Sequence, residues 1–215
     1  MSKAIKGRDF RAELAGIDLW DAACEAQLAE RGEALVDRPL QSREELIDLC
    51  RLIERCGIRS YLEIGVWTGA LVRLLHDLFD FELVAACDQG YAERFGLEVR
   101  LPPGARFFRG SSESAGYAEF RAELGSVDLV MIDADHSYRA VRADFERERR
   151  FQQRFVALHD ITGARRQTAG VGRLWREISG GHKLEIVRPA AELGLDHSLM
   201  GIGIWSSFDN GKRED

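Results

Sequence analysis

The sequence predicts an α/β protein with one doubly wound, seven-stranded, mostly parallel β-sheet, helices on both faces and additional N-terminal helices. From residue 58 onward, short apolar segments alternate with segments of helical period, which is typical of strand–helix–strand units. Residues 127–132 form a near-continuous apolar run, as expected of a strand buried on both faces of a parallel sheet. The chain has 215 residues, a length that suits one domain with a sizeable core.

The first part of the chain is predicted to be helical. Residues 9–34 have the pattern of one or two helices. Ser42 and Glu45 match a capping box, in which a serine and a glutamate three residues later satisfy each other's backbone N–H groups at a helix start. Gly57 stands where a glycine commonly ends a helix. We therefore expect a third helix between Ser42 and Gly57.

Residues 58–208 are expected to form the α/β domain, on which residues 1–57 pack as a helical cap to give one compact unit. Most of the predicted strands are short apolar runs that end at a glycine or a polar residue. The predicted strands are residues 60–64, 81–87, 106–109, 127–132, 155–158, 184–187 and 200–205, and the predicted helices include residues 71–79, 138–154 and 172–178.

Polar side chains follow five successive predicted strands at the point where each strand ends. In open α/β sheets, ligands bind outside the carboxyl ends of the strands, so these side chains are candidates for a binding site. They are Glu63, Asp88, Ser111, Ser112, Asp133, His159 and Asp160.

The turn after the first strand carries Gly65 and Gly69, with Trp67 between them. A dinucleotide-binding turn needs glycine at the position of Trp67 so that the backbone can approach a pyrophosphate. A phosphate-binding P-loop needs Lys-Ser or Lys-Thr after the last glycine, and the chain lacks it. The turn therefore suits a ligand without phosphates, and Asp88 at the end of the next strand could accept hydrogen bonds from the hydroxyls of a ribose.

Residues 132–138, which read Ile-Asp-Ala-Asp-His-Ser-Tyr, carry the most specific resemblance to a known family. With weaker support from residues 164–178, the chain resembles the class I S-adenosylmethionine-dependent methyltransferases over residues 58–206. The string is similar to that of the group that contains antibiotic- and sugar-modifying O-methyltransferases and proteins labelled cephalosporin hydroxylase. That group usually has glycine at the position of Ala134. The resemblance implies a Rossmann-like fold and S-adenosylmethionine as cofactor.

The resemblance also implies which residues meet the cofactor. Gly65 and Gly69 would pass its methionine part, Asp88 would bind the ribose, and Ser111 with Ser112 would lie by the adenine. The serines could instead cap a helix that begins near Glu113. The predicted cofactor-binding residues are Glu63, Gly65, Trp67, Gly69, Asp88, Ser111, Ser112 and Asp133.

A second implied feature is a divalent cation, Mg²⁺ or Mn²⁺, held by Asp133, His159 and Asp160. Related metal-dependent O-methyltransferases place an acid or amide where this chain has His159. Because magnesium prefers oxygen ligands, the histidine favours a softer metal, a role for His159 as a base, or a site without metal.

Asp135 and His136 are the predicted catalytic residues, since methyl transfer to a hydroxyl needs a group that takes its proton. In relatives with an acid at the position of Asp135, that residue is assigned as the general base, and the imidazole of His136 could serve instead. The alternatives are that Asp135 caps the helix beginning near Ser137 and that His136 has a supporting role.

The proposed reaction is therefore O-methylation of a small-molecule hydroxyl on a sugar, polyketide or phenol. Two other functions fit the same residues. A non-haem iron oxygenase could use His136, His159 and Asp160 as a two-histidine, one-carboxylate set. A non-catalytic protein could retain only the nucleoside pocket.

Composition limits the partners. The formal net charge is −6, which argues against a general nucleic-acid binder. No apolar run approaches the roughly 20 residues that span a bilayer, so no membrane partner is expected. The 4 cysteines lack metal-type spacing and fit free thiols in a reducing cytoplasm. The N-terminal helices could cover the site or form a homodimer contact.

Overall fold

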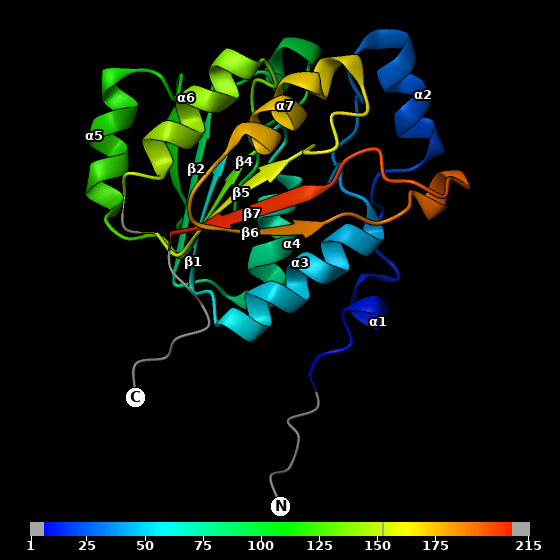
Figure 1. The fold of residues 1–215 in the computed structure, drawn as a ribbon, viewed down its shortest axis with the longest axis horizontal. Helices are drawn as coiled ribbons and strands as arrows, with labels where there is room; N and C mark the ends of the chain where they lie inside the picture. Colours follow the sequence, from blue (N-terminus) through cyan, green and yellow to red (C-terminus); the bar gives the residue numbers. More distant parts are fainter. Residues whose placement is uncertain (1–6, 152, 208–215) are drawn as a thin grey trace, which may run out of the picture.

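The computed structural model describes residues 7–151 and 153–207 (Figure 1). Its seven strands form one sheet in the order β3-β2-β1-β4-β5-β7-β6, in which β1 to β5 are parallel and β7 runs antiparallel to both neighbours. The strands are β1 (Ser60–Ile64), β2 (Leu83–Asp88), β3 (Arg106–Arg109), β4 (Leu129–Ile132), β5 (Phe155–His159), β6 (His182–Ile186) and β7 (Ile202–Ser206). This is the predicted Rossmann-like, doubly wound, seven-stranded fold.

Helices cover both faces of the sheet. In Figure 1, α5, α6 and α7 lie on one side of the sheet, and α3 and α4 lie on the other. Side chains alternate between the faces along each strand, so Tyr61 packs with one group of helices and its neighbour Leu62 with the other. The helices are α1 (Phe10–Leu14), α2 (Ala22–Arg31), α3 (Arg43–Cys56), α4 (Ala70–Phe79), α5 (Ala115–Leu124), α6 (Tyr138–Glu148) and α7 (Ala169–Glu177).

The N-terminal segment contributes to two cores. Phe10 and Leu14 of α1 pack into the core on the α3 and α4 side of the sheet. Trp20 and Cys24 belong to a separate apolar cluster with Met200 from the loop between β6 and β7. The N-terminal residues around α2 therefore rest on that loop rather than on the sheet. Within the described ranges, no helix is long and apolar enough to cross a membrane.

The predicted capping box at the start of α3 is wrong. Ser42 is the N-cap residue, but its side chain accepts no hydrogen bond from the helix. Glu45 is fully buried, and its carboxylate accepts hydrogen bonds from the Arg188 backbone N–H at 3.0 Å, the Ser198 hydroxyl at 2.6 Å and the Gly201 backbone N–H at 2.9 Å. Tertiary contacts with the loop between β6 and β7 thus take the glutamate away from the local cap.

Glu45→Ala is expected to lower the free energy of unfolding by about 2–4 kcal/mol, because three donors would lose a buried acceptor. Urea denaturation of both proteins measures this difference. Glu44→Ala is the matched control, since Glu44 pairs with Arg11 at the surface and its loss should cost less than about 1 kcal/mol. Equal losses for the two variants would contradict the role of Glu45 in anchoring the loop.

Candidate active site

The carboxyl ends of the parallel strands open into a cavity of about 1120 Å³. The strand order reverses between β1 and β4, which is where doubly wound sheets bind their ligands. The cavity walls also include side chains of α2, of residues 38–41 and of the loop after β5. A single ligand of drug size usually fills a pocket of about 300–1,000 Å³, so this cavity has room for a cofactor and a second molecule.

The two glycines of the first turn are required by contacts with the protein's own backbone. Gly65 has φ +86°, and a Cβ there would lie 2.2 Å from the carbonyl oxygen of Asp133 and 2.5 Å from the Cα of Ala134. A Cβ at Gly69, φ +79°, would lie 2.2 Å from the carbonyl oxygen of Arg100. Gly65 lines the cavity, whereas Gly69 does not. Gly65 therefore lets the loop after β4 close against the turn after β1.

Trp67 adopts the left-handed conformation, with φ 52°, although it is not a glycine. Its ring packs against Tyr91 and Phe95, with centroid distances of 5.9 and 5.8 Å, and its Nε1–H donates to the Val36 carbonyl at 3.3 Å. These contacts offset a backbone cost of about 1–3 kcal/mol. The indole lines the cavity at the position where a dinucleotide-binding turn has glycine.

Asp88 lies at the end of β2 and lines the cavity. Its Oδ1 accepts hydrogen bonds from the backbone N–H groups of Gly90 at 2.6 Å and Tyr91 at 3.1 Å, and its Oδ2 accepts one from Val66 at 2.9 Å. Since each carboxylate oxygen has two lone pairs, Oδ2 can accept one more donor. The carboxylate thus joins the first turn to β2 and can still accept one ribose hydroxyl.

Ser111 and Ser112 do not cap α5. Ser114 is the N-cap residue, and its hydroxyl oxygen accepts from the Tyr117 N–H. Ser112 lines the cavity, whereas Ser111 does not and accepts from the Glu113 N–H at 3.2 Å. Of the two predicted adenine residues, the structure therefore places only Ser112 at the cavity.

Glu63 is a buried acid in the cavity wall. The Tyr61 hydroxyl donates to its Oε2 at 2.5 Å. Burial raises the pKa of Glu63 to about 8, and the nearby Asp133 carboxylate acts in the same direction. At neutral pH the side chain is therefore mainly protonated and uncharged.

The raised pKa of Glu63 predicts a pH dependence of stability. Between its ordinary pKa of 4.5 and about 8, the folded state holds a proton that the unfolded state releases, so stability falls as pH rises through this window. The Glu63 contribution falls by up to about 1.4 kcal/mol per pH unit. In Glu63→Gln we therefore expect the free energy of unfolding to fall less from pH 5 to pH 8, measured by urea denaturation. Glu98→Gln, at an exposed site, should keep the wild-type slope; a wild-type slope in Glu63→Gln would contradict the prediction.

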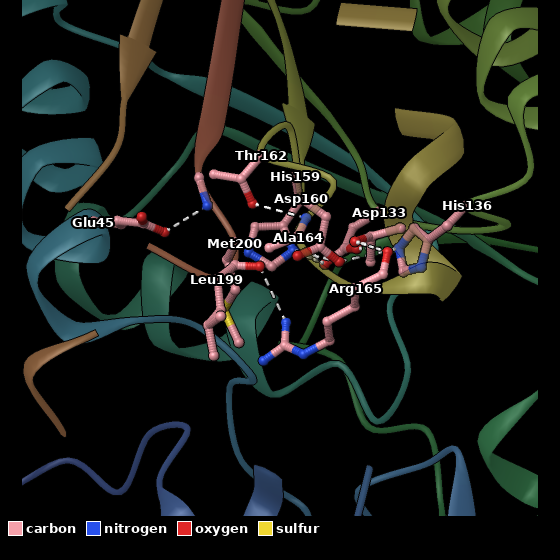
Figure 2. A network of polar contacts seen from close by, with 12 residues as sticks. Glu45, Asp133, His136, His159, Asp160, Thr162, Ala164, Arg165, Leu199 and Met200 are labelled. Carbon is pink, nitrogen blue, oxygen red and sulfur yellow. Dashed lines mark hydrogen bonds and ion pairs between the residues drawn. The ribbon is translucent and has the colours of Figure 1, made fainter. Parts of the chain in front are cut away.

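The ends of β4 and β5 bring two aspartates and two histidines together (Figure 2). His159 Nδ1 lies 3.2 Å from Asp133 Oδ2, and His136 Nε2 lies 3.0 Å from Asp133 Oδ1. Asp160 Oδ2 lies 3.9 Å from His159 Nδ1 and 3.7 Å from His136 Nε2. One donor atom each from Asp133, His159 and Asp160 can be chosen so that all three lie within 4.8 Å of one another, a spacing compatible with one metal ion.

Charge dominates this cluster. Burial lowers the pKa of His159, but the carboxylates of Asp133 and Asp160 outweigh burial and raise it to about 10. Burial likewise raises the pKa of Asp133, but the two histidines outweigh burial and hold it well below its usual value. Asp160 adopts a left-handed φ of 63°, and its buried Oδ1 has no partner among the described residues. The cluster therefore pairs its carboxylates with imidazoles and leaves Asp160 Oδ1 as an open acceptor.

Asp135 is exposed in the cavity wall, and its Oδ1 accepts from the Ser137 N–H at 2.8 Å. Ser137 itself is the N-cap residue of α6, so the alternative that Asp135 caps this helix is wrong. Asp135 and His136 both line the cavity, at the end that holds Asp133. Each is therefore placed to meet a bound molecule.

Arg165, in the loop after β5, joins three segments over the cavity. It forms an ion pair with Glu25 of α2, donates to the Leu199 carbonyl at 3.2 Å, and lies 5.2 Å from the ring centroid of Trp20 (Figure 2 shows the contact with Leu199). Its neighbour Arg166 lines the cavity and has no acidic partner in the part of the chain that the structure describes.

Sequence reasoning missed Glu25 and Gln41. Gln41 is buried in the cavity wall, and its Oε1 has no partner among the described residues. Neither residue belongs to a recognisable motif. Only the fold brings α2 and the segment before α3 to the strand ends.

A family model described as a methyltransferase domain matches residues 62–161. No curated protein is a significant match to the chain. Among solved structures, the O-methyltransferase from Bacillus cereus in complex with SAH is 14% identical, with coverage of 94% of this chain and 93% of that chain and a TM-score of 0.53. The O-methyltransferase TomG from Streptomyces achromogenes, in complex with SAM, is 13% identical, with 94% and 91% coverage and a TM-score of 0.51. A putative O-methyltransferase from Klebsiella pneumoniae is 12% identical, with 88% and 98% coverage and a TM-score of 0.55.

At these identities the solved structures establish the fold, and the family model describes residues 62–161 as a methyltransferase domain. The matched residues run from β1 through the end of β5 and include the turn at Gly65, Asp88 and the cluster around Asp133. Residues 62–161 thus match a methyltransferase domain, and the chain has the fold of solved O-methyltransferases.

Proposed function

We propose that the protein transfers a methyl group from S-adenosylmethionine to a hydroxyl oxygen of a small molecule such as a sugar, polyketide or phenol, with help from a divalent cation. The observation that carries this proposal is the cluster of Asp133, His159 and Asp160 in the wall of a cavity with room for two molecules. The names of the O-methyltransferases from B. cereus and S. achromogenes, which share the fold, also support it.

The cofactor is proposed to lie along the ends of β1, β2 and β3. Asp88 accepts a ribose hydroxyl through its free Oδ2 position, and Ser112 lies beside the adenine. Glu63, Gly65 and Trp67 form the wall beside the methionine part, and Asp133 is close enough to β1 to face its ammonium group. Gly69 and Ser111 act indirectly, because neither lines the cavity.

The acceptor is proposed to lie over the ends of β4 and β5. Transfer forms a bond between the acceptor oxygen and the methyl carbon and breaks the bond from that carbon to sulfur, whose electron pair stays on sulfur. The hydroxyl proton moves to a base, and Asp135 and His136 are the candidates that line this end. A divalent cation would supply a Lewis acid that lowers the pKa of the hydroxyl.

The donor set fits a cation. Asp133 and Asp160 are carboxylates at adjacent strand ends, and the unpartnered buried Oδ1 of Asp160 is the kind of orphaned acceptor that a cation satisfies. His159 adds an imidazole nitrogen 3.2 Å from Asp133. Because binding of an ion requires these three side chains and not the cofactor, the two parts of the proposal can be tested separately.

The deciding experiment incubates the purified chain with S-adenosylmethionine and a panel of phenols, catechols, sugars and polyketide alcohols. Formation of S-adenosylhomocysteine together with a methyl ether on one acceptor is the expected result, and prior treatment with a chelator should reduce the rate. Full activity after chelation would overturn the cation's role. Methylation found only on nitrogen, on RNA or on protein would overturn the choice of acceptor.

A further inference from the structure

We infer that Arg73 is a positioning residue for the cofactor, because it holds residues 36–41 against the turn after β1. Residues 36–41 are called the wall segment, since four of them line the cavity, namely Arg38, Pro39, Leu40 and Gln41. Arg73 itself does not line the cavity, so it acts through the residues that it contacts. The inference rests on the proposed function, because it concerns the cofactor of the same site.

The side chain of Arg73 joins three segments of the chain. It is half-buried near the start of α4, directly after the turn. Its Nη1 donates to the carbonyl oxygens of Thr68 at 2.9 Å and Arg100 at 2.8 Å, and its Nη2 donates to Asp37 Oδ1 at 2.7 Å. A guanidinium is planar and directs its N–H donors rigidly, so these three acceptors are held in fixed positions relative to one another.

The contact between the turn and the loop after η1 (Ala92–Phe95) is close. The Arg100 N–H donates to the Thr68 carbonyl at 3.0 Å, and a Cβ at Gly69 would lie 2.2 Å from the Arg100 carbonyl oxygen. Arg73 donates to both of these carbonyls. It therefore fixes the turn from outside the cavity, since neither Gly69 nor Arg100 lines it.

The wall segment depends on side chains for its position. It lies between α2 and α3, outside any helix or strand, so no repeating pattern of backbone hydrogen bonds holds it. The Trp67 Nε1–H donates to the Val36 carbonyl at 3.3 Å, and Arg73 donates to Asp37. The cavity-lining residues follow directly after these two ties. Arg73 and Trp67 thus place the wall segment beside the turn.

The wall segment brings an unused hydrogen-bond acceptor to the cavity. Gln41 is 2% exposed, and its Oε1 has no partner among the residues that the structure describes. A buried acceptor without a donor is unfavourable, so an N–H or O–H group of a bound molecule would be stabilised there. Because a displacement of about 1 Å can cost a factor of about 100, the position of this wall matters for binding.

The exposure of the ion pair separates a positioning role from a merely structural one. The side chains of Arg73 and Asp37 are 28% and 36% exposed. Pairs with such exposure contribute little to the free energy of unfolding. Loss of the pair should therefore appear in the local order of the wall segment and in cofactor affinity, with little change in global stability.

The test uses the full chain and S-adenosylhomocysteine. Calorimetry gives the affinity, hydrogen–deuterium exchange of peptides over residues 36–41 gives local order, and urea denaturation gives global stability. Arg73→Met and Asp37→Asn should each weaken binding about 10-fold to 100-fold and speed exchange in the wall segment, with a nearly unchanged denaturation midpoint. Because both changes break one contact, the double variant should bind as Arg73→Met does. Arg73→Lys keeps the charge without the fork and should bind with intermediate affinity.

Arg106→Met is the matched control. Arg106 also donates to a carbonyl and a carboxylate, both of Glu123, and it lies outside the cavity. Its variant should keep the wild-type affinity and the wild-type exchange of residues 36–41. If Arg73→Met does not fold, Asp37→Asn decides the matter, because Asp37 is exposed.

Wild-type affinity in Asp37→Asn would overturn the inference. Additive losses in the double variant, or an equal loss of affinity in Arg106→Met, would also overturn it. The proposed methyl transfer is judged separately, from the methyl ether. Binding of S-adenosylhomocysteine without any methyl ether would overturn the proposed reaction alone, whereas no binding by the wild type would overturn both.

Discussion

Gly65→Ala is expected to destabilise the folded protein by about 3 kcal/mol or more and to abolish binding of S-adenosylhomocysteine. The new Cβ would lie 2.2 Å from the Asp133 carbonyl oxygen, and because that atom is backbone, no side-chain rotation can relieve the overlap. The turn after β1 and the loop after β4 must then separate, which moves Asp133 from its place beside Glu63 and the histidines. Urea denaturation gives the stability loss, and calorimetry with S-adenosylhomocysteine gives the affinity.

Gly57→Ala separates the effect of overlap from that of backbone conformation. Gly57 also has a positive φ, of 57°, but a Cβ there would meet nothing within 4 Å. Its alanine variant should therefore lose only about 1 kcal/mol and keep its affinity for S-adenosylhomocysteine. Similar losses in the two variants would mean that the close approach at Gly65 does not control the site.

The sheet was predictable because each of its strands is marked locally. β1 occupies the predicted residues, since a short apolar run followed by a glycine turn has few other solutions, and β3 also lies at the residues predicted for it. Boundaries were less exact where polar residues continue a helical pattern. The predicted helix 138–154 ends at Glu148 in the structure. After Glu148 the chain must turn back to enter β5 at Phe155, and this requirement outweighs the helix propensity of the sequence.

The residues of the candidate site whose positions follow from the order of the strands could be predicted from the sequence. Asp133 and His159 end strands that are neighbours in the sheet, so parallel pairing alone brings them together. The position of His136 depends on a tight connection that no periodicity describes. The contacts between side chains over the cavity could not be predicted either, because they also depend on loops without a periodic pattern. Arg165 meets Glu25 across 140 positions of sequence, through loops that have no fixed register.

The error at Glu45 has a similar cause. Its spacing from Ser42 fits a local cap, but the loop between β6 and β7 offers three donors instead. Local sequence identifies the start of the helix correctly and the partner of its glutamate incorrectly. A buried carboxylate is most stable where it accepts the most hydrogen bonds. For Glu45 the donors come from a segment that is distant in the sequence.

Asp133→Asn is expected to lower kcat/KM by about a thousandfold or more, equivalent to about 4 kcal/mol of transition-state stabilisation. Both oxygens of Asp133 face imidazole nitrogens, at 3.0 and 3.2 Å, and the side chain reaches the cavity. Asparagine keeps the shape but removes the charge and replaces one oxygen with an N–H donor. It therefore weakens the cation site and the contact proposed for the cofactor's ammonium group at once. Initial rates of S-adenosylhomocysteine formation, with the best acceptor of the panel, measure the loss.

Asp77→Asn provides the comparison, since Asp77 is exposed on α4 and lies outside the cavity. It should retain the wild-type rate, so a loss confined to Asp133→Asn comes from the site and not from the change in net charge. Far-ultraviolet circular dichroism should match that of the wild type, because the two side chains have nearly the same volume. A folded Asp133→Asn that kept more than a tenth of the wild-type kcat/KM would remove Asp133 from the catalytic centre. Asp160 and His159 alone would then have to hold the acceptor, and their own substitutions would become the decisive variants.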